Sequence, residues 1–424
     1  MRLLEHGRFV VLLGCTYIGV KGLVGTLLQT TMLPFFKNEL HLDSSTYQMC
    51  FTVLMLPWTL KSLIGLLADN VRPCGLAVVP FFAGSVVYGT VSALALAAGM
   101  YLEWDMGVHS ILFLTFGVSL QIAVNDLLTE GRYAFMMREH KAIATSVVST
   151  VWWFMTIGAF VGTVTAGLLA GTPGSSYVPF AVAAVFSGQN IIPVLIGSFL
   201  PEVPPSKSDA TSDGIVYACI AVSSAACAMS IANLFASVDV QLCVCVLAVA
   251  CAVGVSMKVL SKEMAACNVY MCLANTLYLG FPGAIDYWYT APHTCVRGGP
   301  AFTMSYYILV SGLVGSLFSA FGVWLYRRWL SQWPYRKVFQ FTTILRCAGA
   351  CVDVVLINRW NLSIGLPDKV VYLCGNAMLR PVIMALDSMP MVTLTAQLCP
   401  AGSENTVYAL LASYQNFGGG AANI

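Results

Sequence analysis

Long apolar runs alternate with short polar stretches along the whole chain. A helix that crosses the hydrocarbon core of a bilayer needs roughly 20 apolar residues, and each run is about that long. Barrel strands would instead be short and would alternate apolar with polar residues. The pattern therefore predicts an all-α polytopic membrane protein. The thirteen expected spans are 9–36, 45–68, 76–100, 107–136, 143–170, 177–200, 214–236, 240–258, 265–290, 302–326, 337–357, 370–398 and 404–424.

Composition agrees with this class and excludes several others. Hydrophobic residues make up 58% of the chain and charged residues only 9%, which leaves too little polar surface for a soluble globule. The formal net charge of +2 and the lack of a basic cluster argue against a nucleic-acid partner. Neither the 15 cysteines nor the five histidines show the spacing of a metal or catalytic site, so we expect no metal, no cofactor and no enzyme.

The distribution of lysine and arginine predicts the orientation. Thirteen of the 21 cationic residues fall on the side that holds the amino terminus, four fall on the other side and four lie inside spans. Cytoplasmic loops of membrane proteins carry the excess of such residues. We therefore expect a cytoplasmic amino terminus.

A polar segment divides the spans into two groups. Residues 201–213 are rich in proline, serine and charge, and they are expected to form a cytoplasmic linker after an N-terminal six-helix bundle of residues 1–200. Two six-helix halves are typical of the major facilitator superfamily. The turn GLLADNVRPCG (65–75) resembles a loop of that superfamily, in which Asp69 can meet a helix end or Arg72 and lock one conformer. The alternative is that both are ordinary solvated loop residues.

The second group of spans does not match the first in number. If the basic turn at 326–337 corresponds to the turn at 65–75, residues 214–259 form an inserted helical hairpin, expected to pack peripherally and to face lipid. Residues 260–424 then form a truncated C-terminal bundle, in which we expect the last helix to be missing.

Eight ionisable side chains lie inside the apolar runs. A charge at bilayer depth persists mainly where it meets a partner or a watery cavity, so these residues indicate a path for a polar solute. We expect them to converge on one aqueous crevice between the two bundles. They are Lys21, Lys61, Asp126, Asp286, Arg346, Asp353, Arg380 and Asp387.

Five segments of the chain match a known family in order and spacing. They are LPWTLKSLIGLLAD (56–69), NDLLTEGRYAFMMR (125–138), FPGAIDYWYT (281–290), NRWNLSIGLPD (358–368) and MPMVTLTAQLCPAGSENTVYALLASYQNFGG (389–419). These segments resemble the folate/biopterin (pteridine) transporter family of the major facilitator superfamily, and most closely its kinetoplastid-like branch. The resemblance implies a secondary active transporter of folate or biopterin-type pteridines, coupled to protons and working by alternating access. It further implies a monomer in the lipid bilayer of the plasma membrane. The open alternatives are a transporter of another organic solute with the same fold, and an inactive, truncated family member.

In the first half, the candidate residues suit such a substrate. A carboxylate such as Asp126 can grip the aminopyrimidine edge of a pterin, or it can bind the coupled proton. Glu130 follows on the same helix face and is a candidate for gating. Trp58 and Lys61 are three residues apart, so a ring can stack beside a cation, while Lys21 lies near mid-span. The alternatives are a structural ion pair for Asp126 and a snorkelling Lys61.

In the second half, two pairs share a spacing of seven residues. Arg346 with Asp353, and Arg380 with Asp387, each lie along one stripe of a helix, and cross-pairing of the two helices would neutralise all four. The alternative leaves an arginine free to bind a substrate carboxylate. Asp286, among aromatic residues near the outer end of its span, is a candidate outer ligand.

Overall fold

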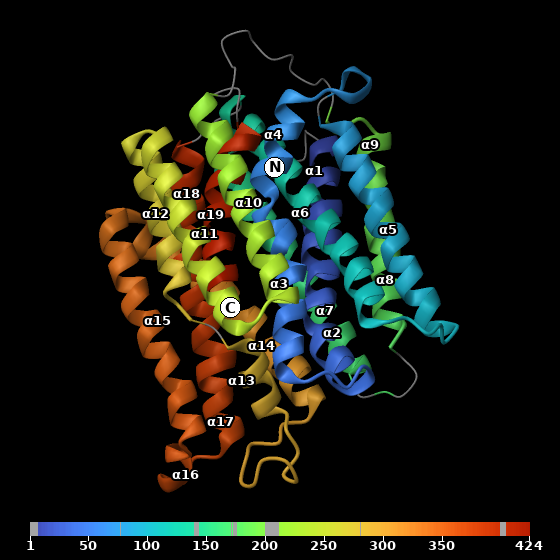
Figure 1. Cartoon of the computed structure of the whole chain (residues 1–424), viewed down its shortest axis with the longest axis vertical. Helices are drawn as coiled ribbons and strands as arrows, with labels where there is room; N and C mark the ends of the chain where they lie inside the picture. The colour runs from blue at the N-terminus through green and yellow to red at the C-terminus, as the bar shows by residue number, and fades with distance from the viewer. Residues whose placement is uncertain are drawn as a thin grey trace.

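The computed structural model describes residues 7–76, 78–139, 144–170, 172, 176–199, 212–279, 281–398 and 404–424. These residues form helices and no strand, as Figure 1 shows, and this confirms the predicted all-α class. Within this part of the chain, eleven helical segments are long and apolar enough to cross a membrane.

The first six spans come from residues 7–195. The first is continuous but changes its winding, and π-helical turns occupy Gly14–Val24 and Phe35–Glu39. The helices and short turns are α1 (Gly7–Leu13), η2 (Gly14–Val24), α2 (Gly25–Pro34), η3 (Phe35–Glu39), α3 (Ser44–Thr59), α4 (Lys61–Asn70), η4 (Pro73–Gly75), α5 (Val79–Tyr101), α6 (Val108–Glu139), α7 (Ala144–Leu169), α8 (Val178–Gly188), η6 (Gln189–Ile191) and α9 (Ile192–Leu195).

The remaining elements follow residue 212. They are α10 (Asp213–Phe235), α11 (Val238–Val259), α12 (Lys262–Thr276), α13 (Pro282–Tyr289), η7 (Tyr306–Val310), α14 (Ser311–Arg328), η8 (Leu330–Gln332), α15 (Tyr335–Ile357), α16 (Trp360–Ser363), α17 (Asp368–Tyr372), η9 (Leu373–Leu379), α18 (Arg380–Leu398) and α19 (Glu404–Ala421).

Two of the thirteen predicted spans take a different form. The run at 265–290 is split into α12 and α13, because proline stands at the start of α13 and cannot donate the backbone hydrogen bond that a continuous helix needs. The last run is α19, which is helical as expected but is not among the eleven apolar spans. Its amide and glycine residues, including Gln415, Asn416 and Gly418, make it less apolar.

Helix contacts repeat between the two groups of spans. The first span packs on α7 as α12 packs on α19, and α3 packs on α6 as α14 packs on α18. The seam between the groups is formed by α3 and α4 against α19, and by α7 against η7 and α14. The division into domains stays a prediction. Of the linker predicted at 201–213, residues 201–211 lie outside the described part of the chain.

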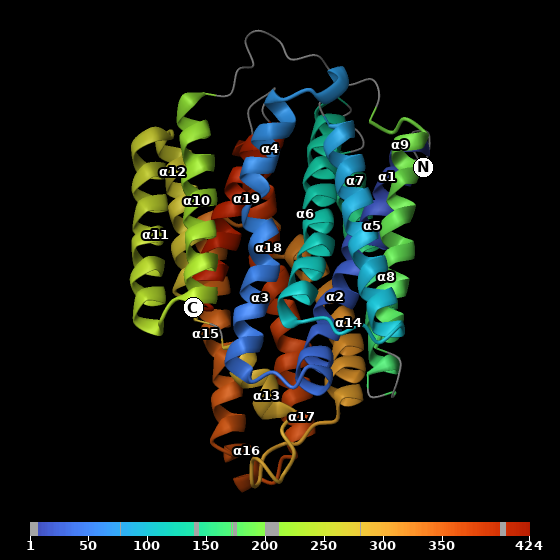
Figure 2. The ribbon, with the colours of Figure 1, turned by 45° about the vertical axis from the view of Figure 1, so that its right-hand side comes forward.

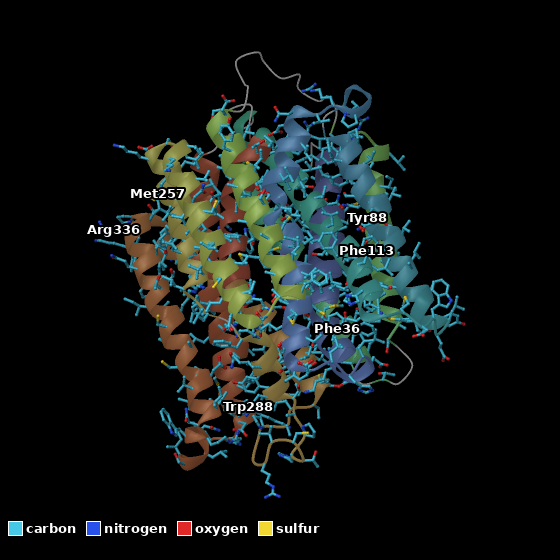
Figure 3. The ribbon with its side chains drawn as sticks, in the orientation of Figure 1. Phe36, Tyr88, Phe113, Met257, Trp288 and Arg336 are labelled. Atoms are coloured by element: carbon cyan, nitrogen blue, oxygen red, sulfur yellow. The ribbon has the colours of Figure 1, made fainter. Side chains whose placement is uncertain are left out.

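The hairpin predicted at 214–259 is formed by α10 and α11. Figure 2 shows α11 at the outer edge of the molecule. In Figure 3, Met257 of α11 and Arg336 of α15 both lie at that edge. The expectation of a wholly peripheral hairpin is wrong for α10, which packs on α3, α4 and α19 and therefore touches both sides of the seam. Small residues permit this contact, and the hydroxyls of Ser223 and Ser62 lie 3.2 Å apart.

The first span and α7 approach closely through glycine. A Cβ on Gly158 would overlap the backbone oxygen of Ile18 and lie 2.9 Å from Cα of Gly22. Small residues at such crossings let helix backbones meet inside a bilayer. This contact fixes the span that carries Lys21.

We predict that Gly158→Ala lowers the free energy of unfolding by about 2 kcal/mol, because the added methyl group overpacks a backbone contact. Thermal unfolding of the purified protein in detergent measures this change. Gly84→Ala is the matched control, because a Cβ there meets nothing within 4 Å. Equal stability of the two variants would contradict the proposed packing.

Candidate functional site

A buried ionic cluster lies inside the first group of spans. The Asp126 carboxylate accepts hydrogen bonds from Lys21 Nζ on both oxygens, at 2.8 and 2.9 Å, and from Lys61 Nζ on Oδ2 at 2.6 Å. Glu130 lies 3.4 Å from the Lys61 ammonium and 4.0 Å from that of Lys21. Two cations and two anions thus balance each other at one point of the membrane interior.

Three segments of the chain position this cluster. Lys21 lies in the π-helical stretch η2, and such wide turns occur frequently at functional sites. Lys61 is the first residue of α4, after a break in the helix at Leu60. Asp126 and Glu130 are one turn apart on α6 and therefore share a face.

Burial differs within the cluster. The side chains of Asp126 and Lys61 are 0% and 3% exposed, whereas Lys21 is 24% exposed. An ion pair in the membrane interior needs excellent geometry to offset the loss of hydration. Lys21 is thus the member of the cluster that can also reach a solute.

Aromatic rings surround the two ammonium groups. Trp58 lies under Lys61 Nζ at 4.7 Å from its ring centroid and under Lys21 Nζ at 5.8 Å. Tyr17, four residues before Lys21, lies 5.6 Å from the same nitrogen. Because Asn416 of α19 donates a hydrogen bond to the backbone oxygen of Trp58, the cluster adjoins the seam.

The structure contains the ion pair that was the alternative interpretation of Asp126. The alternative of a snorkelling Lys61 is wrong, because its ammonium is buried against Asp126 rather than extended to an interface.

A second pair connects α15 and α18. Arg346 Nη1 donates to Asp387 Oδ2 at 3.0 Å, and the hydroxyl of Thr342 donates to the other oxygen of Asp387 at 2.8 Å. The Arg346 guanidinium lies 4.0 Å from the ring centroid of Tyr278. The Arg346–Asp387 bond is one of the two ion pairs that cross-pairing of these helices predicts, the other being Arg380 with Asp353.

The other half does not form in the described part of the chain. Asp353 instead accepts hydrogen bonds from Tyr289 OH at 2.8 Å and Asn376 Nδ2 at 2.9 Å. Arg380 is exposed, has no ion pair among the described residues, and lies within electrostatic range of Asp286. It follows directly on the π-helical stretch η9.

Asp286, which belongs to α13, is the centre of a third group of hydrogen bonds. Its carboxylate accepts a hydrogen bond from Tyr307 OH at 2.6 Å and one from Tyr47 OH at 3.5 Å. Tyr307 belongs to η7 and Tyr47 to α3, so one carboxylate touches both sides of the seam.

The eight ionisable residues fall into several groups by direct contact, and their convergence on one crevice stays a prediction. Seven residues of helix span about 10 Å along the axis, so each stripe places its two charges at different depths. The groups are the Asp126 cluster, the Arg346–Asp387 pair, and a third region in which the rings of Tyr289 and Tyr307, the partners of Asp353 and Asp286, lie 6.2 Å apart.

Hydrogen bonds close the seam at the end that holds Asp69, the upper end in Figure 1. The Asp69 carboxylate accepts from Asn405 Nδ2 at 2.7 Å, and from the backbone N–H and hydroxyl of Thr406 at 3.0 and 2.6 Å. It thereby caps the amino terminus of α19 from another helix, where a negative charge is favourable. Arg72 shows no ion pair in the described part of the chain.

Short α13 bridges the seam at the opposite end, where Figure 3 places Trp288. Its Tyr287 OH donates to the backbone oxygen of Leu42, and the N–H of Gly283 donates to Gln48 Oε1. Lys37 Nζ donates to Thr290 Oγ1 at 2.6 Å, just beyond α13. Both ends of the seam are therefore bridged.

A cavity lies elsewhere, between the end of the first span, α7 and α8. Its volume is about 280 Å³, and none of the predicted site residues line it. The lining residues are Thr31, Pro34, Phe35, Asn38, Glu39, Ala166, Leu169, Ala170, Thr172, Ser176, Pro179 and Phe180.

Several contact residues were missed from the sequence. Tyr17 has a local signal, because it stands one helical turn before Lys21. Tyr307, Thr342 and Asn405 have none, because they meet their partners across 21 to 336 residues of chain.

Known proteins resemble this chain in fold and sequence. The auto inhibited POT family peptide transporter, a crystal structure, superposes with a TM-score of 0.64 at 14% identity, covering 99% of this chain and 88% of the other. This likeness shows the fold, a multi-span helical bundle like that of the peptide transporter.

The family follows from sequence. The model of the BT1 family matches residues 21–423, and the chain belongs to that family. "Probable folate-biopterin transporter 6" of Arabidopsis thaliana is 25% identical over 403 residues, which cover 94% of this chain and 71% of the relative. "Folate-biopterin transporter" of Synechocystis sp. is 24% identical over 405 residues, covering 94% and 70%. The predicted family is thereby confirmed, and the kinetoplastid-like branch stays a prediction.

We predict that Asp126→Asn lowers the free energy of unfolding by about 3 kcal/mol, because it leaves two buried ammonium groups with one carboxylate. Thermal unfolding in detergent measures the loss. Asp43→Asn is the matched control, because Asp43 caps α3 at the surface and asparagine caps equally well. Similar unfolding temperatures for both variants would show that the cluster does not stabilise the fold.

Proposed function

We propose that this transporter carries folate or biopterin-type pteridines across a membrane by alternating access, coupled to protons. The observation that carries the proposal is the buried Asp126 cluster, in which one of the two lysines is partly exposed beside the seam. The names of the relatives from Arabidopsis thaliana and Synechocystis sp. support the substrate class.

The chemistry of a pteridine suits these residues. The flat ring stacks on Trp58, and the aminopyrimidine edge offers parallel donors to a carboxylate such as Asp126. The glutamate tail of folate carries carboxylates that pair with Lys21 and with Arg380, which lacks an ion pair among the described residues. Asp286 and the Arg346–Asp387 pair are the remaining proposed contacts of the second half.

The balance of charges in the Asp126 cluster suggests where the coupled proton binds. When a substrate carboxylate takes the Lys21 ammonium, the cluster holds one anion too many for its cations. A proton on Asp126 or Glu130 restores neutrality in a region where excess charge is costly. Return of that proton to water releases the substrate on the other side. Asp353 and Asp387 are the corresponding candidates in the second half.

The two ends of the seam are the proposed gates. Asp69 closes one end by capping α19, and α13 closes the other. Arg72 is placed beside the first gate in sequence. Alternating access then requires that each set of hydrogen bonds opens in turn.

Orientation and setting complete the proposal. The lysine and arginine bias favours a cytoplasmic amino terminus, with Asp69 at the cytoplasmic end. The two groups of spans act as two bundles, residues 1–200 and 260–424, around the inserted hairpin. The protein functions as a monomer in the lipid bilayer of the plasma membrane.

Uptake of labelled folate and biopterin tests this function in cells that lack their own carriers. We expect uptake above background, driven by an inward proton gradient, and none of an unrelated nucleoside. Asp126→Asn and Arg380→Ala are each expected to reduce uptake more than tenfold, because each removes a charge that binds substrate or proton.

Surface expression of each variant is measured alongside uptake, and Arg336→Ala on the outer edge of α15 is the matched control. Wild-type rates in both site variants would remove Asp126 and Arg380 from the mechanism. Uptake of the nucleoside alone would favour another organic solute.

A further inference from the structure

We propose that Gly131 is a positioning residue for the Asp69 gate: it provides the space that holds the Asn405 amide against Asp69. This inference rests on the proposed alternating access, because it concerns how one end of the seam closes. Gly131 is not among the candidate site residues that the sequence predicted.

Gly131 lies against the side chain that bonds Asp69. A Cβ at position 131 would overlap Asn405 Oδ1 and lie 2.6 Å from Asn405 Cγ. This oxygen is buried and has no hydrogen-bond partner among the described residues, so packing on Gly131 is its main contact. The nitrogen of the same amide donates to Asp69 at 2.7 Å. Any side chain at position 131 therefore forces the amide away from Asp69.

A second glycine receives the backbone of the same residue. A Cβ on Gly65 would lie 2.8 Å from the backbone oxygen of Asn405 and 3.2 Å from Cβ of Ala409. Gly65 belongs to α4 and Gly131 to α6, so the first turn of α19 docks between two helices of the other group. We call Gly65 and Gly131 the glycine socket.

The socket is continuous with the ionic cluster. Lys61, Gly65 and Asp69 follow at intervals of four on α4 and share one helix face. On α6, Gly131 directly follows Glu130. Eight residues of helix span about 12 Å, so the cluster and the gate are two turns apart on rigid elements. Movement of α19 out of the glycine socket therefore changes the packing on the helix face that carries Lys61.

Thiol labelling measures the gate without any substrate. Ala409 is fully buried beside the socket, so the thiol introduced by Ala409→Cys reports opening of this end of the seam. The purified protein is treated with a water-soluble maleimide, and mass spectrometry gives the labelled fraction of each peptide. Exposed Cys295 and buried Cys50, on α3, serve as internal standards.

We expect Gly131→Ala to raise the labelling rate at this position about fivefold or more, because one charge-assisted hydrogen bond to Asp69 is lost. Asn405→Ala is expected to have a similar effect. The double variant Gly131→Ala with Asn405→Ala is expected to label no faster than Asn405→Ala alone, since no amide is left to displace. Gly84→Ala, where a Cβ meets nothing within 4 Å, leaves the rate unchanged.

Two outcomes would overturn the proposal. One is an unchanged rate in Gly131→Ala, and the other is a full additional increase when it is combined with Asn405→Ala. If Gly131→Ala also exposes Cys50, the fold has opened, and the double variant must restore the protection of Cys50 for the proposal to hold.

The result is independent of the substrate. If Gly131→Ala increases labelling but the parent chain takes up no pteridine, the role of the glycine socket is supported and the proposed substrate is rejected. Normal uptake with unchanged labelling would reject the socket alone.

Discussion

The ion pairs of the buried Asp126 carboxylate with Lys21 and Lys61 hold the first span, α4 and α6 together, and the rest of the structure depends on this contact. Asp126 is fully buried, and an isolated charge there would cost several kcal/mol, so the first span, α4 and α6 must hold both ammonium groups within bonding distance. The π-helical turn at Lys21 and the helix break before Lys61 are the local features that permit this. The same arrangement leaves Lys21 partly exposed, which connects a structural requirement to solute binding.

The two ends of the seam close by different chemistry. At one end, a carboxylate caps a helix terminus, an interaction between a full charge and aligned backbone dipoles. At the other end, hydroxyl groups and a lysine bond around the short helix α13. Because α4 carries both Lys61 and Asp69, the cluster and one gate belong to the same rigid element.

The sequence predicted those features that depend on local pattern. Apolar runs of membrane length indicated the helices, and the intramembrane charges Lys61 and Asp126 belong to the buried ionic cluster. It did not predict the split between α12 and α13, where a proline interrupts an apolar run. Nor did it predict partners such as Tyr307 or Asn405, because which residues meet across the seam depends on the packing of distant helices.

The expected cross-pairing of four charges in the second half formed only in part, for a related reason. Charges on one helix face share a direction but not a depth, so the two members of a stripe meet different partners. Asp353 bonds a tyrosine and an asparagine, whereas Asp387 bonds an arginine. Periodicity therefore identifies the face of a helix, and only the assembled bundle identifies the partner.

The most direct test of the central claim is the affinity of the purified protein for folate, measured by titration calorimetry, in the parent chain and in Lys21→Met. If Lys21 leaves Asp126 to bind a substrate carboxylate, the affinity falls about tenfold or more. Lys262→Met, at the exposed start of α12, is the control and should bind as the parent does. Equal affinity in Lys21→Met and the parent would contradict a role for the Asp126 cluster in substrate binding.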